Sequence, residues 1–305
     1  MDRVLLTGGA GFIGPHLADR LVQRSRVTVV DNLSTGRLEH VNSAAEFVKG
    51  DLLHDDLAEY FTDKDTVFHM AANPEVRMGT SDTRVHLDQN VMVTYNVLEA
   101  MRKKGVKKLV FVSTSTVYGE AETPTPENYG PLLPISLYGA SKLACEALVS
   151  SYCSLFDIQA WIFRLANVIG PRSSHGVIFD FVDKLRANPE ELEILGDGNQ
   201  RKSYIHVQDC LDGILCGMRE QARISVFNLG SEDQTPVKRI AQIVSEEMKL
   251  APVFRFTGGD RGWRGDVPVM LLSVKKIQQL GWRLRYKSEE AVRVTARFLV
   301  ESGAA

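Results

Sequence analysis

Short apolar runs alternate with longer helical patterns through the first half of this 305-residue chain. Runs typical of buried strands lie at residues 4–6, 27–30, 46–48, 66–69, 108–112 and 159–163. Apolar residues at helical spacing occur at residues 15–24, 55–60, 84–103 and 138–156. The alternation predicts an α/β fold with a Rossmann-type, doubly wound parallel sheet, whose ligands bind at the carboxyl ends of the strands.

The pattern changes after Asn167, where Gly, Asn and Pro become more frequent and apolar pieces such as 192–195 are shorter. Thr235-Pro236 predicts the start of a helix. Residues 205–207 and 226–229 are candidates for a return to the main sheet. We therefore expect a first domain at 1–167, with returns near 204–230, and a smaller α/β domain, mainly at 168–305, interleaved with it.

A glycine-rich turn separates the first predicted strand from the first predicted helix. Gly8, Gly11 and Gly14 have the spacing that permits a tight turn, approach of the backbone to a pyrophosphate, and close packing of helix on strand. Pro15 fits the first turn of the helix, where its missing N–H costs nothing. Because a helix N-terminus attracts phosphate, this segment predicts dinucleotide binding.

Asp31 ends the second predicted strand, about 20 residues beyond the glycines. A carboxylate there can accept hydrogen bonds from the ribose hydroxyls of the adenosine half and would repel a 2′-phosphate. The sequence thus favours NAD over NADP.

Tyr138 and Lys142 lie four residues apart in a predicted helix, so their side chains share one face. A neighbouring ammonium lowers the pKa of a tyrosine from its usual value of about 10, and a tyrosinate can act as a general base on a hydroxyl. The preceding strand ends in Ser113-Thr114-Ser115, whose hydroxyls would emerge beside a nicotinamide. For Ser113 and Ser115, capping of a turn is an equally good interpretation.

The composition argues against two classes of binding partner. The formal net charge is −2 with no long basic run, so neither nucleic acid nor an anionic membrane is expected. Apolar runs stop short of the roughly 18 residues needed for a bilayer span, and a strand beginning at residue 4 leaves no room for a signal peptide. We expect a cytoplasmic protein. Its four scattered cysteines predict buried thiols, with no metal site.

The chain resembles the extended short-chain dehydrogenase/reductases and, within them, the UDP-glucose 4-epimerases. The resemblance covers nearly the whole sequence and is carried by these segments: residues 7–14, 31–33, 50–52, 69–72, 90–91, 117–119, 138–142, 164–171, 204–209 and 265–268.

The resemblance implies a catalytic group of Thr114, Tyr138 and Lys142. It implies that NAD contacts Gly8, Gly11, Phe12, Ile13, Gly14, Asp31, Asn32, Ser34, Thr35, Gly36, Asp51, Leu52, Met70, Ala71, Ala72, Asn90, Ser113, Tyr138, Lys142 and Leu165. It implies that a UDP-sugar contacts Val76, Thr114, Ser115, Tyr138, Asn167, Val177, Leu195, Lys202, Tyr204, Arg264 and Asp266.

The implied reaction uses NAD without consuming it. Tyr138 takes the proton of the sugar 4-hydroxyl while the C4 hydride passes to the nicotinamide, Thr114 binds that oxygen, and Lys142 keeps Tyr138 ionised. The 4-keto sugar then rotates and takes the hydride back on its other face, which inverts C4. The resemblance also implies a homodimer formed through the helices at 84–103 and 138–156.

Several positions depart from that pattern. Pro74 stands where bacterial relatives often have a lysine, and Trp263 stands where many have an arginine. Arg261 and Arg264 are candidates to bind the diphosphate instead, and a solvated surface charge is an equally good interpretation of each. His175, in a predicted lid loop, is better explained as a surface residue than as a proton carrier.

Related enzymes offer alternative functions. Dehydratases and decarboxylases of the same family carry an acid just after the catalytic threonine, whereas this chain has Ser115 and Thr116, which cannot replace a carboxyl group. Epimerases of UDP-glucuronate or of N-acetylated sugars remain open, although the bulk of Met270 favours the unacetylated sugar. A non-catalytic NAD-binding scaffold would not need Thr114, Tyr138 and Lys142 together, and Asp31 argues against an NADPH-dependent reductase.

Overall fold

The computed structural model describes residues 2–303 and divides them into two compact units. Unit 1 holds the residues up to Val117 together with Ser136–Arg164 and Gly217–Phe227. Unit 2 holds Tyr118–Ile135, Leu165–Cys216 and the residues from Asn228 onward.

These units differ from the predicted domains in two places. The segment 118–135 belongs to unit 2, because its backbone is bonded there: Thr125 N–H donates to the carbonyl of Leu271, and Thr125 C=O accepts from Ser273. The return to unit 1 is confined to Gly217–Phe227, shorter than the predicted 204–230.

A seven-stranded sheet has the strand order β3-β2-β1-β4-β5-β6-β11. Its strands are β1 (Arg3–Thr7), β2 (Arg26–Asp31), β3 (Glu46–Lys49), β4 (Thr66–His69), β5 (Lys108–Thr114), β6 (Gln159–Leu165) and β11 (Ile224–Leu229). β1 pairs in parallel with β2 and β4, β2 with β3, and β4 with β5. The predicted α/β class with a doubly wound sheet is confirmed. The strand order reverses between β1 and β4, which is where such sheets bind their ligands.

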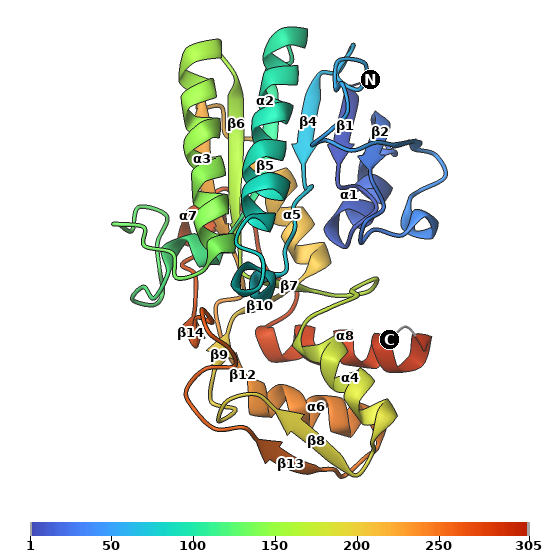
Figure 1. Cartoon of the computed structure of the whole chain (residues 1–305), viewed down its shortest axis with the longest axis vertical. Helices are drawn as coiled ribbons and strands as arrows, with labels where there is room; N and C mark the ends of the chain where they lie inside the picture. Colours follow the sequence, from blue (N-terminus) through green and yellow to red (C-terminus); the bar gives the residue numbers. More distant parts are fainter. Residues whose placement is uncertain (1, 304–305) are drawn as a thin grey trace. The chain divides into compact units, whose positions relative to one another are not determined.

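The helices of unit 1 are α1 (Ile13–Leu21), α2 (Val93–Lys104) and α3 (Leu137–Phe156). A π-helical segment, η3 (Leu87–Met92), leads into α2, and short 3₁₀ segments are η1 (Leu38–His40), η2 (Val76–Thr80) and η4 (Ser115–Tyr118). α2 and α3 run side by side along the sheet (Figure 1) and bury Met101 and Val149 in one core with Phe111 of β5.

The helix predicted at residues 55–60 is absent, and turns take its place. Asp55 accepts a hydrogen bond from the backbone of Asp51, and Asp56 from that of Ala58. Such short acidic side chains compete with helical backbone bonds and favour turns.

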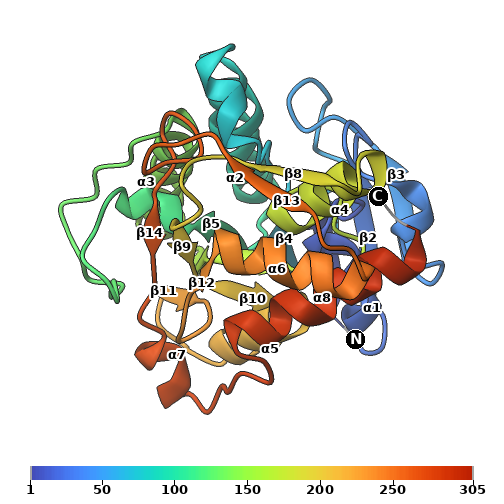
Figure 2. The same cartoon turned by 90° about the horizontal axis from the view of Figure 1, so that it is seen from below.

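In unit 2, helices α4 (Val177–Ala187), α6 (Val237–Met248) and α8 (Ser288–Ser302) share a core that includes Phe181, Ile240 and Val292. Figure 2 shows α6 and α8 side by side. The remaining helices are α5 (Val207–Gly217) and α7 (Lys275–Gln279). Short strands form three small sheets: β7 (Asn167–Ile169) with β10 (Tyr204–His206), β8 (Glu191–Ile194) with β13 (Val253–Phe256), and β9 (Arg201–Lys202) with β12 (Thr235–Pro236) and β14 (Val269–Met270).

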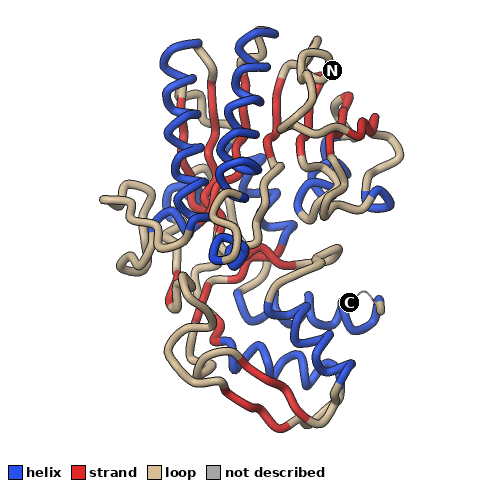
Figure 3. The backbone as a smooth tube through the Cα atoms, in the orientation of Figure 1, coloured by secondary structure: helices blue, strands red, loops and turns tan. Residues whose placement is uncertain are grey.

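Of the two segments expected to rejoin the main sheet, one does so. Residues 226–229 lie in β11 at the sheet edge, whereas 205–206 lie in β10, which pairs with β7 in a separate two-stranded sheet. The loop between η4 and α3 has neither helix nor strand (Figure 3). Within residues 2–303, none of the helices has the length and apolar character required to cross a membrane.

Candidate active site

The glycine turn after β1 is packed against its neighbours on one side and open on the other. Gly8 has a φ of +69°, and a Cβ there would lie 2.5 Å from the backbone nitrogen of Ala71. A Cβ at Gly14 would lie 2.5 Å from the carbonyl oxygen of Gly8, whereas one at Gly11 would meet nothing closer than 3.5 Å. The turn therefore fits a pyrophosphate, which needs the backbone to be bare on the ligand side.

Asp31 is held in place at the end of β2. Its Oδ2 accepts a hydrogen bond from the backbone N–H of Ala10 at 2.9 Å, and its Oδ1 accepts one from Leu33 at 2.8 Å. Each carboxylate oxygen keeps a further lone pair for a ribose hydroxyl. The next residues, Asn32, Ser34, Thr35 and Gly36, form the loop beyond β2, which bonds to the glycine turn through Arg37 N–H and the carbonyl of Ala10 at 2.9 Å.

The loop after β4 is fixed by an amide from η3. Asn90, which is buried, accepts from the N–H of Asn73 at 2.7 Å and donates to the hydroxyl of Ser141 on α3 at 3.0 Å. It thereby joins the segment that follows Met70, Ala71 and Ala72 to the helix carrying Tyr138 and Lys142. The bonds of the Asn90 amide are to protein groups, and its predicted contact with the nicotinamide side stays a prediction.

The residues predicted to react lie near the carboxyl end of β5. The hydroxyl of Thr114 lowers the pKa of the Tyr138 phenol, but burial outweighs this effect and raises the pKa of Tyr138 to about 12. Lys142 is buried, and its ammonium lies 4.3 Å from the centre of the Phe111 ring. Burial also lowers the pKa of Lys142. The predicted lowering of the Tyr138 pKa by Lys142 is therefore wrong for the chain alone, because desolvation dominates.

The three hydroxyls at the end of β5 have different surroundings. Thr114 Oγ1 accepts from the N–H of Thr116 at 3.2 Å and lies 3.1 Å from its hydroxyl. Ser113 donates to Glu146 at 2.5 Å, and Ser115 is buried at the start of η4. Of the three, Thr114 is the one whose hydroxyl lowers the pKa of Tyr138.

A buried ion pair next to these groups was not predicted. Arg164 donates from Nη2 to Oε2 of Glu146 at 2.6 Å, with both side chains 7% exposed. The available signal was spacing, because Glu146 follows Lys142 by four residues on the same helix, as Lys142 follows Tyr138.

Unit 2 gathers several of the residues expected to contact a nucleotide-sugar. Lys202 forms an ion pair with the buried carboxylate of Asp266, which also accepts from the N–H of Gly262 at 3.1 Å. The ammonium of Lys202 lies 5.0 Å from the centre of the Trp263 ring. Met270 pairs with Lys202 between β14 and β9, so the predicted width-limiting residue lies beside this cluster.

The two candidate arginines differ in their partners. Arg261 pairs with Glu120 at 2.5 Å and donates to the carbonyl of Asp266 at 3.1 Å, whereas Arg264 is exposed. Asn167 hydrogen-bonds the hydroxyl of Tyr204, whose pKa is raised because it is buried. The other predicted sugar contacts are placed at the start of α4 (Val177), after β8 (Leu195) and, in unit 1, in η2 (Val76).

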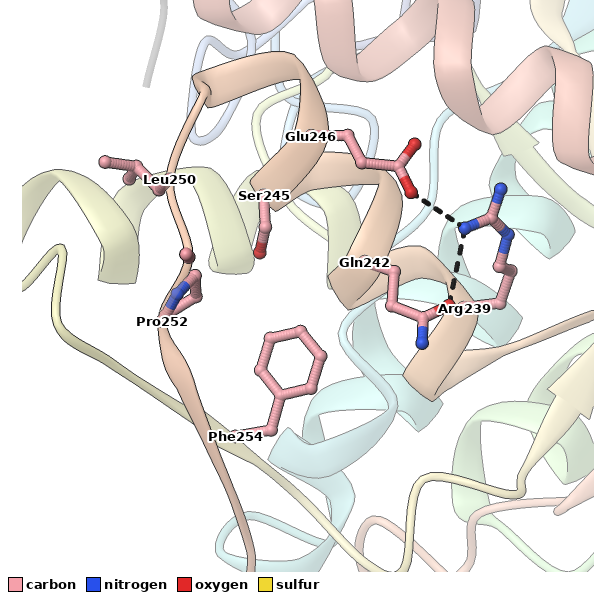
Figure 4. A pocket seen from close by; sticks show the side chains of 8 residues that line it. Arg239, Gln242, Ser245, Glu246, Leu250, Pro252 and Phe254 are labelled. Carbon is pink, nitrogen blue, oxygen red and sulfur yellow. Dashed lines mark hydrogen bonds and ion pairs between the residues drawn. The ribbon is translucent and has the colours of Figure 1, made fainter.

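Figure 4 shows a surface pocket of unit 2. It is lined by Arg239, Gln242, Ser245, Glu246, Leu250, Ala251, Pro252 and Phe254, from α6, the following loop and β13. Arg239 is already paired with Glu246 and with Glu289 of α8. The pocket contains none of the residues predicted to react or to bind.

Comparison with known proteins places this geometry in a family. Residues 4–230 match the model of the NAD dependent epimerase/dehydratase family. A UDP-glucose 4-epimerase of Mycolicibacterium smegmatis is 34% identical over 78% of this chain and 80% of its own.

Two solved structures are similar over nearly the full length. One is a UDP-galactose 4-epimerase, with 46% identity and a TM-score of 0.91, covering 98% of this chain and 99% of its own. The other is the UDP-glucose 4-epimerase of Thermus thermophilus in complex with NAD, with 32% identity and a TM-score of 0.88, covering 99% and 100%. The predicted cofactor, NAD, is thereby confirmed. With a glycine turn shaped for a pyrophosphate and a family model matching most of its length, the chain belongs to the NAD-dependent epimerase/dehydratase family.

Proposed function

We propose that this protein is an NAD-dependent UDP-hexose 4-epimerase that interconverts UDP-glucose and UDP-galactose. The observation that carries the proposal is that Thr114, at the carboxyl end of β5, lies close enough to Tyr138 to lower the pKa of its phenol, with Lys142 one turn further along α3. The names of the relatives described above support the same activity.

Tyr138 accepts the proton of the sugar 4-hydroxyl, and Thr114 hydrogen-bonds that oxygen. When bound, NAD supplies the acceptor for the C4 hydride. Because burial raises the pKa of Tyr138, the phenolate needs a nearby cation, and Lys142 is the cation on its face of α3. Rotation of the 4-keto sugar and return of the hydride and proton invert C4, so no net oxidation occurs.

The residues after Thr114 favour epimerisation over elimination or decarboxylation. Ser115 and Thr116 are neutral hydroxyl residues, and the Thr116 hydroxyl lies 3.1 Å from that of Thr114. A carboxyl group able to shuttle a proton at the sugar C5 or C6 is thus missing from these two positions.

We infer that unit 1 binds NAD and that unit 2 binds the UDP-sugar. In unit 2, Lys202 is the half-buried cation of the cluster and Arg264 the exposed one. We assign both to the diphosphate, because Arg261 is held by Glu120. Met270 limits the room for a substituent on the sugar, which favours the unacetylated substrate.

We also propose a homodimer formed by α2 and α3. Exposed apolar side chains occur on these helices and on η3: Leu87, Met92, Tyr95 and Leu155. Sedimentation equilibrium of the wild type should give twice the chain mass of 33.9 kDa. The variant Leu155→Arg should give the mass of one chain. A wild-type monomer would refute this part of the proposal.

The activity itself is tested by incubating the purified protein with UDP-glucose, UDP-galactose, their N-acetylated forms and UDP-glucuronate, without added NAD. Proton NMR then reports the stereochemistry at C4. We expect inversion of the two unacetylated hexoses. Inversion of only the N-acetylated or the uronic sugar would reassign the substrate, and a 4-keto product that accumulates would contradict the epimerase.

A further inference from the structure

A third polar residue continues the catalytic face of α3. Tyr138, Lys142 and Glu146 follow one another at intervals of four residues, which places them along one side of the helix. The Glu146 side chain is 7% exposed. A buried carboxylate is costly in free energy unless it is paired and hydrogen-bonded. The residues that bind the Glu146 carboxylate therefore indicate its role.

Those partners come from two different strands of the sheet. Ser113 of β5 donates from its hydroxyl to Oε1 of Glu146 at 2.5 Å. Arg164 of β6 donates from Nε to Oε1 at 3.0 Å and from Nη2 to Oε2 at 2.6 Å, which is a bidentate arrangement. One carboxylate therefore joins α3, β5 and β6.

These contacts lie next to two of the three groups proposed to react, Thr114 and Lys142. Ser113 directly precedes Thr114 in β5, and Glu146 lies one helical turn beyond Lys142. Holding α3 on β5 at this point fixes how far Thr114 stands from Tyr138. Misplacement of reacting groups by about 1 Å can lower a rate by roughly 100-fold, so a joint here has a direct consequence for turnover.

The negative charge of Glu146 also acts on the ammonium of Lys142. Within residues 2–303, no carboxylate lies within ion-pair distance of the Lys142 ammonium, which rests on the Phe111 ring. Glu146 opposes the loss of the lysine's proton that burial favours. Arg164 balances Glu146, so the intact pair carries little net charge.

We propose that Glu146, held by Ser113 and Arg164, is a positioning residue for Thr114, Tyr138 and Lys142. It acts through the placement of α3 on β5 and touches neither substrate nor cofactor. This inference rests on the proposed epimerase activity, because that activity is what the three groups are positioned for.

The test compares Glu146→Gln with wild type for kcat, KM, the pH dependence of kcat and the content of bound NAD. We expect kcat to fall by roughly 10- to 100-fold with KM nearly unchanged. The variant removes the carboxylate that opposes loss of the Lys142 proton and that balances the charge of Arg164, so the alkaline limb of the pH profile should move to lower pH. Ser113→Ala, which removes a single hydrogen bond and keeps the ion pair, should lower kcat by a smaller factor.

Glu247→Gln is the matched control. Glu247, on α6 of unit 2, is also a largely buried carboxylate with two arginine partners, Arg293 and Arg297, each at 3.0 Å. Glu247→Gln should lower Tm without changing kcat or the pH profile. If Glu146 had a purely structural role, Glu146→Gln would give this same result.

A double variant, Glu146→Leu with Arg164→Met, removes the joint without leaving a buried charge. We expect it to recover the wild-type pH profile but to remain slow. Wild-type kcat in this double variant, or in a folded Glu146→Gln, would overturn the inference. If Glu146→Gln does not fold, a wild-type kcat in Ser113→Ala has the same meaning. Failure of the wild type to invert C4 overturns the proposed function, and with it this inference.

Discussion

The two polar clusters proposed to cooperate are built in different ways. In unit 1, Thr114, Tyr138 and Lys142 are placed by a long strand and a 20-residue helix, and their immediate contacts are hydroxyls and an aromatic ring. In unit 2, Lys202 and Asp266 lie on a two-residue strand and a loop, and an ion pair joins them. The first arrangement suits proton transfer within a fixed distance, and the second suits recognition of a charged ligand.

The largest expected effect breaks the cluster of unit 1. Tyr138→Phe should lower turnover by a factor of roughly 100 or more, because it removes the group that takes the proton, while NAD remains bound. The rate of C4 inversion and the NAD content of the purified protein measure the two parts.

Tyr152→Phe is its control, because Tyr152 lies on the same helix with its hydroxyl bonded to Glu99 at 2.7 Å. It should keep near-normal turnover. If Tyr138→Phe turned over as fast as this control, Tyr138 could not be the base.

The matching change in unit 2 is Lys202→Met. Loss of a charge-assisted hydrogen bond costs about 1.5–3 kcal/mol, so KM for the UDP-sugar should rise by roughly 10- to 100-fold, with kcat much less affected. Steady-state kinetics measure both constants. Lys238→Met, at an exposed lysine of the same unit, should change neither. A fall in kcat with KM unchanged would contradict the proposal that the unit 2 cluster binds the UDP-sugar and the unit 1 cluster transfers the proton.

Asp31→Ala tests whether unit 1 selects its cofactor by charge. Removing the carboxylate should weaken NAD by about tenfold, the value of one or two hydrogen bonds, and should reduce discrimination against NADP. Titration of the cofactor-free protein with NAD and with NADP gives the ratio of the two dissociation constants. An unaltered ratio would assign selectivity to other residues.

The last effect concerns stability toward acid and leaves the activity untouched. His69 is buried between the hydroxyls of Thr7 at 2.7 Å and Thr94 at 3.1 Å, and burial lowers its pKa from 6.5 to about 3. The unfolded chain therefore binds a proton between these values and the folded chain does not.

The free energy of unfolding should consequently fall as the pH drops from about 6.5 toward 3, by up to about 1.4 kcal/mol per pH unit from this residue. Urea unfolding at a series of pH values measures the slope, which His69→Gln should make shallower. An identical slope in the variant would exclude His69 as the cause.

The contrast between the units also explains what the sequence could predict. The strands and most helices of unit 1 were predicted because their apolar runs and helical periodicity are long, and the glycine turn has strict spacing. The pairing of β10 with β7 was not predicted, because a three-residue strand carries no information about its partner. Residues 118–135 were assigned to the wrong unit for a similar reason, since their bonds to Leu271 and Ser273 join distant parts of the chain.

Within the site, residues in motifs were easier to predict than the contacts between them. Thr114, Tyr138 and Lys142 could be named from sequence, but the dominance of burial in the pKa of Tyr138 depends on the packing around it. The partnership of Glu146 with Arg164 joins residues 18 positions apart through side-chain geometry, which spacing alone does not reveal.

The backbone bonds of Asp31 have a consequence for how cofactor preference can change. The carboxylate that would repel a 2′-phosphate also ties the glycine turn to the loop after β2, through Ala10 and Leu33. A substitution that admits NADP therefore removes two supports of the turn at the same time. An evolving lineage would have to gain stability elsewhere before, or together with, such a switch, so the preference for NAD is protected by the architecture of the turn as well as by charge.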